Sequence, residues 1–305
     1  MKPIVVVGSI NMDLVSHTEH IPKAGETVLG ESFEMHSGGK GANQAVAVAR
    51  LGYPSVLLGA VGDDAFGNRL LTILENAHVD VSYVKEANGS SGTATIVVDS
   101  EGENTIIVTA GANSAVTPQY LEANRGVLAN AGMVLTQLEI PIESVAWLGD
   151  FCSHHDVPFI LDPAPALPLP NTLMKKITWF TPNQTEAAFY AKESDSTEQI
   201  LNSLFGMGVE NIILKQGSRG AVLATADGAC LSISPFAVKS LDSTAAGDAF
   251  NGAFAVSMMR GNTPVDSARY AAAAAAVSVT RRGAQPSLAN DDEVLSLFRV
   301  TSNLI

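Results

Sequence analysis

The chain has 305 residues, of which 46% are hydrophobic and 16% are charged, which is enough for one large α/β domain or two smaller ones. The formal net charge of −13 argues against binding to nucleic acid or to an anionic membrane. The net charge does not argue against binding of ATP, because local N–H groups and metal ions hold its phosphates. Two cysteines without a CxxC spacing, no signal-peptide pattern and no apolar run of transmembrane length predict a cytoplasmic protein.

The hydrophobic pattern predicts strands that alternate with helices along the chain. The predicted strands are 4–7, 55–61, 133–138, 158–161, 177–181, 211–215, 221–225, 229–233 and 236–241. The predicted helices are 42–51, 66–77, 118–129, 142–154, 186–191, 197–207, 249–259, 265–279 and 291–298. This alternation predicts a mostly parallel central sheet with helices on both faces. No linker composition interrupts it, so we expect a single domain over 1–305.

Two segments break the alternation, residues 11–36 and residues 90–109. The first contains short alternating pieces broken by Pro22 and Gly25, and the second contains β-runs at 92–98 and 104–109 joined by a turn. We expect antiparallel strands in each segment, and we expect the two segments to pair as a small β lid.

Residues 242–252 (DSTAAGDAFNG) lie between the predicted strand 236–241 and a long predicted helix. Small residues let the backbone approach a ligand, and free N–H groups at a helix start attract phosphate. A carboxylate at Asp248 would repel phosphate, so its presence favours a base that takes a proton from an attacking hydroxyl. The alternative is an Asp that only favours the helix N-terminus.

Four further motifs are compatible with ligand binding or with plain turn chemistry. Residues 37–44 (SGGKGANQ) do not fit the Walker A spacing, but Asn43 could bind sugar hydroxyls. Asp13, in the Asn-Met-Asp run after the first strand, could accept hydrogen bonds from two vicinal hydroxyls. Asn183 and Glu186 have capping-box spacing, and could instead place hydrated Mg²⁺ and nucleotide phosphates. Residues 215–220 could form a hairpin turn or admit a nucleotide.

Residues 280–287 (TRRGAQPS) form a fifth motif, whose carbonyl groups, together with Asp242, could surround a monovalent cation. The six histidines have no metal-binding spacing. We interpret them as structural or exposed.

Together these stretches resemble the ribokinase/PfkB-type carbohydrate kinases, and within them the ribokinase branch, over residues 4–290. Residues 38–45 (GGKGANQA) resemble the first signature of the family, and residues 242–248 (DSTAAGD) resemble the second. The resemblance implies a ribokinase-like three-layer α/β sandwich with a β lid, and a homodimer formed through that lid. It also implies ATP-dependent phosphorylation of the 5-hydroxyl of D-ribose to ribose 5-phosphate.

The resemblance also implies roles for individual residues. Asp248 would be the catalytic base, and the amides of Ala245, Ala246 and Gly247 would form the anion hole. The implied sugar-binding residues are Asn11, Met12, Asp13, Gly39, Lys40, Gly41, Ala42, Asn43, Glu139 and Asp248. The implied ATP-binding residues are Asn183, Lys215, Gln216, Gly217, Ser218, Arg219, Gly220, Gly247, Asp248 and Ala272. The implied K⁺ site comprises Asp242, Thr244, Ser278, Arg281, Gly283 and Ser287. Asn183 and Glu186 would hold Mg²⁺ through water.

The chain departs from the family pattern at two positions. Ala272 stands where relatives often carry Asn or His near the adenine, and Lys215 stands where a small or hydroxyl residue is usual. Other functions remain open at this point. A kinase for deoxyribose, another pentose, a hexose or a nucleoside would use the same chemistry, and a sugar sensor would bind without turnover. A Rossmann-type dehydrogenase is disfavoured because no GxGxxG follows the first strand.

Overall fold

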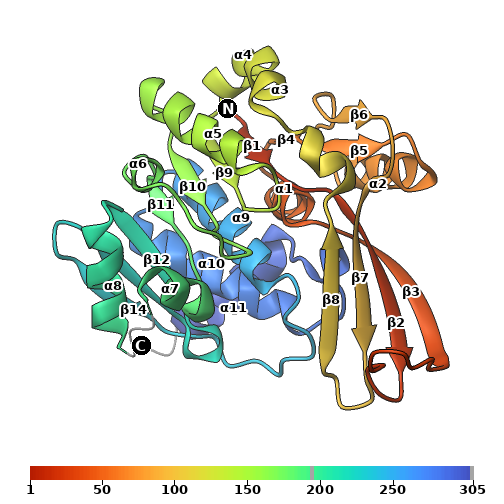
Figure 1. Ribbon diagram of the computed structural model, residues 1–305. Helices are drawn as coiled ribbons and strands as arrows, with labels where there is room; N and C mark the ends of the chain where they lie inside the picture. Colours follow the sequence, from red (N-terminus) through yellow and green to blue (C-terminus); the bar gives the residue numbers. More distant parts are fainter. Residues whose placement is uncertain (193–195, 303–305) are drawn as a thin grey trace.

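A mostly parallel β-sheet runs through the middle of the molecule, as the computed structural model shows for residues 1–192 and 196–302 (Figure 1). Within these residues the sheet has eight strands, with neighbours in the order β14-β13-β12-β11-β10-β9-β1-β4. The strands β12, β11, β10, β9, β1 and β4 are parallel to one another. Strands β13 and β14 are antiparallel to their neighbours. The bounds are β1 Ile4–Val7, β4 Ser55–Leu58, β9 Met133–Thr136, β10 Phe159–Leu161, β11 Trp179–Phe180, β12 Asn211–Lys215, β13 Ala221–Thr225 and β14 Cys230–Ile233.

Alternate side chains of each strand feed two separate cores. In β1, Ile4 and Val6 belong to one buried cluster, and Val5 and Val7 belong to the other. Because successive side chains of a strand point to opposite faces, both faces need apolar cover from helices. One face is covered by α1 Lys40–Arg50, α2 Ala65–Asn76, α9 Ala246–Met259, α10 Pro264–Ser278 and α11 Asp291–Ser302. The other is covered by α3 Pro118–Ala123, α4 Arg125–Ala129, α5 Ile142–His154, α6 Asn171–Met174, α7 Gln184–Tyr190 and α8 Thr197–Gly206.

A second, smaller sheet projects from one side of the molecule (Figure 1). Its strand order is β3-β2-β7-β8, with bounds β2 Asn11–Thr18, β3 Gly30–Gly38, β7 Gly92–Val98 and β8 Asn104–Thr109. The pairings β2–β3 and β7–β8 are antiparallel, and the two hairpins join through parallel pairing of β2 with β7. The expected pairing of the two interrupting segments is therefore present, and the role of this sheet as a lid stays a prediction. A third sheet pairs β5 Ala60–Gly62 with β6 Lys85–Ala87.

Three predicted elements differ from the structure by more than the positions of their ends. The predicted strand 236–241 is absent, because Pro235 interrupts the chain after β14 and the following apolar side chains line a cavity instead of a sheet. The run 55–61 divides at Gly59, whose backbone packs so closely on Ile10 that a Cβ atom would lie 2.9 Å from the Ile10 Cδ1. The helix 118–129 breaks at Asn124 into α3 and α4.

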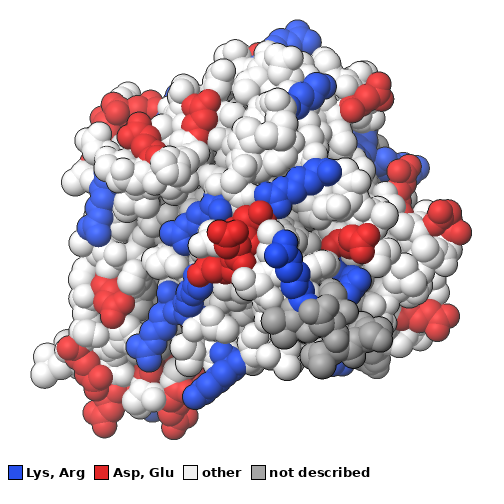
Figure 2. Space-filling view, turned by 180° about the vertical axis from the view of Figure 1, so that it is seen from behind, with Lys and Arg blue, Asp and Glu red and all other residues white. Residues whose placement is uncertain are grey.

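Short elements were not expected from the sequence: α6, β6 and the 3₁₀ turns η1 Gly111–Ala115, η2 Gly217–Arg219 and η3 Gln285–Ser287. Among the described residues, no helix combines the length and the apolar character needed to cross a membrane. On the face seen from behind, acidic and basic side chains are interspersed (Figure 2).

Candidate active site

Polar side chains gather where the parallel strands of the large sheet end. Gln137 and Glu139 follow β9, Asp162 follows β10, Asn183 follows β11, and Lys215 ends β12. The carboxyl ends of parallel strands share one edge of a sheet, and ligands of open α/β sheets bind at that edge. The helices α1 and α9 begin against the same edge and complete the site.

The first turn of α9 carries Asp248, whose exposed fraction is only 5%. Its Oδ2 accepts a hydrogen bond from Asn43 Nδ2 at 2.9 Å, and its Oδ1 accepts one from Gln44 Nε2 at 3.1 Å. Burial raises the pKa of Asp248 to about 6, against the opposing attraction of the Lys40 ammonium. A carboxylate with such a pKa is ionised at neutral pH and is basic enough to accept a proton in catalysis.

The glycines before and within α1 allow that helix to start against the end of β1. Gly39 has a φ of 87°, and a Cβ atom there would lie 2.7 Å from the Ser9 carbonyl oxygen. A Cβ atom on Gly41 would lie 2.5 Å from the carbonyl carbon of Gly8. This close packing places Asn43 beside Asp248, and it gives the predicted Gly39 and Gly41 a structural role.

Two predicted sugar-binding residues, Asp13 and Lys40, interact electrostatically with this carboxylate. Burial, followed by the charge of Glu139, raises the pKa of Asp13 to about 7. Glu139 Oε2 accepts hydrogen bonds from Ser9 Oγ at 2.5 Å and from the Lys40 backbone N–H at 3.3 Å. Desolvation alone would lower the pKa of Lys40, but the carboxylates around it, led by Asp248, raise it, so Lys40 is a cation.

The remaining predicted sugar-binding residues differ in what they offer. Asn11 Oδ1 already accepts a hydrogen bond of 2.7 Å from Asn113 Nδ2. The side chains of Met12 and Ala42 are fully buried in the core, so their contacts to a ligand would be backbone contacts. Asn43 Oδ1 is buried and has no hydrogen-bond partner in the described part of the chain.

A cavity of about 650 Å³ opens beside Asp248 and extends along α9 and α10. Its lining includes charged side chains such as Lys40, Asp162 and Glu186, and apolar ones such as Phe236 and Val279. Most predicted ATP-binding residues line it, namely Asn183, Lys215, Gly217, Ser218, Gly220, Gly247, Asp248 and Ala272. Gln216 and Arg219 do not line it, and Gln216 Nε2 instead donates to Thr197 Oγ1 at 3.3 Å. The cavity therefore offers both charged and apolar contacts to a ligand.

A match to a known protein family decides the class of this site. A model described as "pfkB family carbohydrate kinase" matches residues 1–291. The chain belongs to this family. The predicted carbohydrate-kinase class and the predicted ribokinase-like fold are thereby confirmed.

The sequences of individual relatives match this pfkB-family kinase over nearly its full length. It is 41% identical to the ribokinase of Bacillus subtilis, over 98% of this chain and 100% of the relative. It is 35% identical to the deoxyribokinase of Salmonella typhi, over 96% of this chain and 99% of the relative. The structure of Arabidopsis thaliana ribokinase complexed with ribose and ATP superposes with a TM-score of 0.92 at 35% identity, covering 98% of this chain and 99% of that chain.

In this kinase, Asn183 and Glu186 form the capping box that their spacing predicted. Glu186 N–H donates to Asn183 Oδ1 at 2.9 Å, and Glu186 Oε2 accepts from the Asn183 N–H at 2.7 Å. Both residues also line the cavity, so capping and ligand binding are compatible. Burial, followed by the charge of Asp162, raises the pKa of Glu186, while Lys215 opposes the rise.

The predicted K⁺ residues of the kinase form two neighbouring groups. Asp242 accepts hydrogen bonds from the backbone N–H groups of Thr244, at 2.9 Å, and Gly283, at 2.8 Å. Although burial would raise its pKa, hydrogen bonds led by that from the Thr244 hydroxyl hold the pKa of Asp242 below its usual value. The hydroxyls of Ser278 and Ser287 lie 2.9 Å apart.

The side chain of Arg281 turns away from these groups and pairs with Glu293. Any contact from Arg281 to a cation would therefore be made by its backbone. No cluster of three or more His, Cys, Asp or Glu residues suited to a metal ion occurs in the described ranges 1–192 and 196–302.

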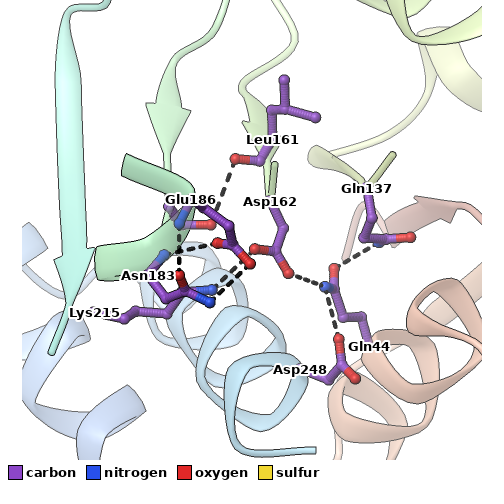
Figure 3. A network of polar contacts seen from close by, with 9 residues as sticks. Gln44, Gln137, Leu161, Asp162, Asn183, Glu186, Lys215 and Asp248 are labelled. Carbon is purple, nitrogen blue, oxygen red and sulfur yellow. Dashed lines mark hydrogen bonds and ion pairs between the residues drawn. The ribbon is translucent and has the colours of Figure 1, made fainter. Parts of the chain in front are cut away.

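Sequence reasoning missed a buried network that links Asp248 to Lys215 (Figure 3). Gln44 Nε2 donates to both Asp248 and Asp162, and Gln44 Oε1 accepts from Gln137 Nε2 at 2.7 Å. Asp162 Oδ1 in turn accepts from Lys215 Nζ at 2.9 Å. Asp162 follows a predicted strand directly, so the strand-end rule that selected Asn183 could have selected it too. The bridging role of Gln44 depends on tertiary contacts, so the sequence pattern does not indicate it.

Proposed function

We propose that this kinase transfers the γ-phosphoryl group of ATP to the 5-hydroxyl of D-ribose, giving ribose 5-phosphate and ADP. The observation that carries the proposal is the buried Asp248 carboxylate, which lies at the start of α9 beside the large cavity and is held by Asn43 and Gln44. The relative solved with ribose and ATP supports this choice of substrates. Similarity to a deoxyribokinase makes 2-deoxyribose the second candidate.

In the proposed reaction, an Asp248 oxygen takes the proton from the sugar O5–H as O5 attacks the γ-phosphorus in line. The new O5–P bond forms while the bond from phosphorus to the β,γ-bridging oxygen breaks, and ADP leaves with that electron pair. The Ala246 N–H donates to the Ser243 carbonyl at 3.2 Å. We therefore leave Ala246 out of the anion hole and assign it to the N–H groups of Ala245, Gly247 and Asp248 at the start of α9.

Sugar recognition rests on Asp13 and Asn43. The unpartnered Asn43 Oδ1 suits a ligand hydroxyl donor, since a buried acceptor left without a partner costs stability. Asp13 can accept from two vicinal hydroxyls, and ribose has such a pair at C2 and C3, whereas 2-deoxyribose lacks it. We therefore expect a preference for ribose, which Asp13→Asn should reduce relative to 2-deoxyribose.

The residues present fit both cations that the family implies. Asp162 and Glu186 are close enough that the Asp162 charge raises the pKa of Glu186, and a divalent cation with its waters would relieve that repulsion. Bound Mg²⁺ supplies charge neutralisation at the phosphates. For K⁺, the ionised Asp242 and the nearby carbonyl and hydroxyl oxygens form an all-oxygen set.

We also propose a homodimer formed through the small sheet. The pairing register puts Ile106 and Val108 on the same face as Asp13, through Ile96 and Ala94. Their exposed fractions are 53% and 52%, which is high for two apolar side chains that are neighbours on one face of a strand. A second copy that covered this face would also exclude water from the sugar.

We place the enzyme in the cytoplasm, in keeping with its two unpaired cysteines.

A substrate panel tests the proposal. ADP release is measured with ribose, 2-deoxyribose, other pentoses, hexoses and nucleosides, each with K⁺ and with Na⁺. The proposal predicts the highest kcat/KM with ribose and stimulation by K⁺. A higher kcat/KM with 2-deoxyribose would favour the second candidate. Sugar binding without ADP release from any substrate would instead indicate a sensor.

A further inference from the structure

Lys215 occupies an unusual place for a lysine, because its side chain is 13% exposed and lies in the interior of the cavity wall. A Cβ atom built on Gly247 would lie 3.5 Å from Lys215 Nζ. Of the residues that the structure describes, no other contributes a heavy atom from outside α9 within 4 Å of that position. The ammonium group therefore stands over the first turn of α9, and the space beside Gly247 is otherwise open.

A single carboxylate holds this ammonium group. Lys215 Nζ donates to Asp162 Oδ1 at 2.9 Å, and the Asp162 side chain is 4% exposed (Figure 3). Removing two charges from water costs several kcal/mol for each ion, so a buried ion pair is weak evidence for stability. The exposed pair of Lys176 with Asp150 has the same chemistry without that cost. The burial of this pair is better explained by the positioning of the Lys215 ammonium group than by stability.

The same carboxylate is tied to the base. Gln44 Nε2 donates to Asp162 Oδ2 at 3.0 Å and to Asp248 Oδ1 at 3.1 Å, and Gln137 fixes the Gln44 amide from the other side. The proposed base and the lysine thus belong to one hydrogen-bonded chain, which runs from α9 through α1 and the residue after β10 to the end of β12.

We propose that Lys215 is a further catalytic residue of phosphoryl transfer, and that Asp162 is the positioning residue that holds it over the start of α9. This proposal rests on the proposed function. The Lys215 ammonium group would contact an oxygen of the transferred phosphoryl group beside the Gly247 N–H, where negative charge develops in the transition state. Its contact with Asp162 keeps it in place before the nucleotide binds, so little reorganisation is needed during transfer.

Kinetics of matched variants separate a catalytic lysine from a structural one. Lys215→Met should lower kcat by about 10²-fold, the loss typical of removing one preorganised transition-state donor, with a smaller change in the KM for ATP. Lys176→Met is the matched control, and it should leave both constants unchanged. If Lys215 only neutralised Asp162, Lys215→Met would change thermal stability and leave kcat and the KM for ATP as they are. The proposal predicts the loss of kcat in a protein that stays folded by thermal unfolding, and an unchanged kcat would overturn it.

A binding measurement tests the same residue without sugar turnover. ADP with Mg²⁺ and tetrafluoroaluminate mimics the transferring phosphoryl group, and calorimetry compares its affinity with that of ADP and Mg²⁺ alone. Lys215→Met should lose at least tenfold in affinity for the fluoride complex and less than threefold for ADP. Equal losses for both ligands, or no loss, would overturn the proposal. A wild type that binds the fluoride complex but phosphorylates no sugar would refute the proposed function and leave the assignment of Lys215 standing.

Discussion

Replacing Asp248 with asparagine removes the proposed base and keeps the size of the side chain. The amide has no lone pair basic enough to take the O5 proton. General base catalysis contributes about 10²–10⁴ in rate, so we expect kcat to fall by this factor. At about 1.36 kcal/mol for each tenfold change, the activation barrier rises by about 3–5 kcal/mol.

The structure also indicates that this variant should stay folded. The asparagine can accept one of the two hydrogen bonds from Asn43 and Gln44, and its own N–H then faces a donor, at a cost of about 1–3 kcal/mol. In the other direction, a pKa of about 6 instead of 3.8 means that the buried charge costs about 3 kcal/mol above pH 6, and the substitution removes that cost. The two effects offset each other to within about 2 kcal/mol.

The assay is ADP release with saturating ribose and ATP, together with ribose binding by calorimetry and thermal unfolding. Asp266→Asn is the matched control, because Asp266 is the third residue of α10 as Asp248 is the third residue of α9, and it is exposed. The control should keep wild-type turnover. A folded Asp248→Asn protein that turns over within threefold of the wild type would refute the assignment of the base.

Three further predictions follow from the charges and surfaces of the site. Because Asp248 must be ionised to act as a base, kcat with saturating ribose should fall as the pH drops below about 6, whereas kcat/KM, which also depends on Asp13, should begin to fall near pH 7. Asp162→Asn should move the fall in kcat to lower pH, since burial first and the Asp162 charge next raise the pKa of Asp248. Asp242→Asn should raise the K⁺ concentration needed for half-maximal activity by about tenfold, because K⁺ loses a charged ligand. Ile106→Asp should convert the dimer to a monomer in light scattering, since it places a charge in the proposed apolar interface.

Each of these predictions has a control in the chain. For K⁺, Asp227→Asn changes an exposed aspartate that also bonds a threonine hydroxyl, and it should leave K⁺ activation as it is. For the dimer, Thr105→Asp places the same charge on the opposite face of β8, and it should leave the dimer intact. An Asp162→Asn profile that matched the wild type would show that the acidic fall has another origin.

Local patterns predicted the large elements well, because their burial follows a regular period. The helix α5 and the strands β7 and β8 begin and end where the sequence indicates. The run 236–241 has the same apolar character as a strand, but its backbone forms none, because its side chains line the cavity. Apolar character alone does not distinguish a cavity wall from a sheet.

The residues of the candidate site likewise include some that the sequence predicted and some contacts that it did not. Asn43 and Asp248, about 200 residues apart in the chain, were both predicted from local glycine-rich motifs, and they bond directly in the structure. The hydrogen bonds of Gln44 with Asp162, and of Asn11 with Asn113, join segments far apart in the chain, and no local pattern indicates which distant side chain each one contacts. For Lys215 the sequence suggested a part in ATP binding, but only the structure reveals the carboxylate that holds it.

The position of the phosphate on the product is the most direct test of the account. The enzyme would be incubated with ATP, Mg²⁺, K⁺ and ¹³C-labelled ribose, and the product examined by ³¹P and ¹³C NMR. The account predicts one phosphomonoester whose phosphorus couples to C5 of the sugar. Phosphorus coupled to another carbon, or release of inorganic phosphate with unmodified ribose, would contradict it.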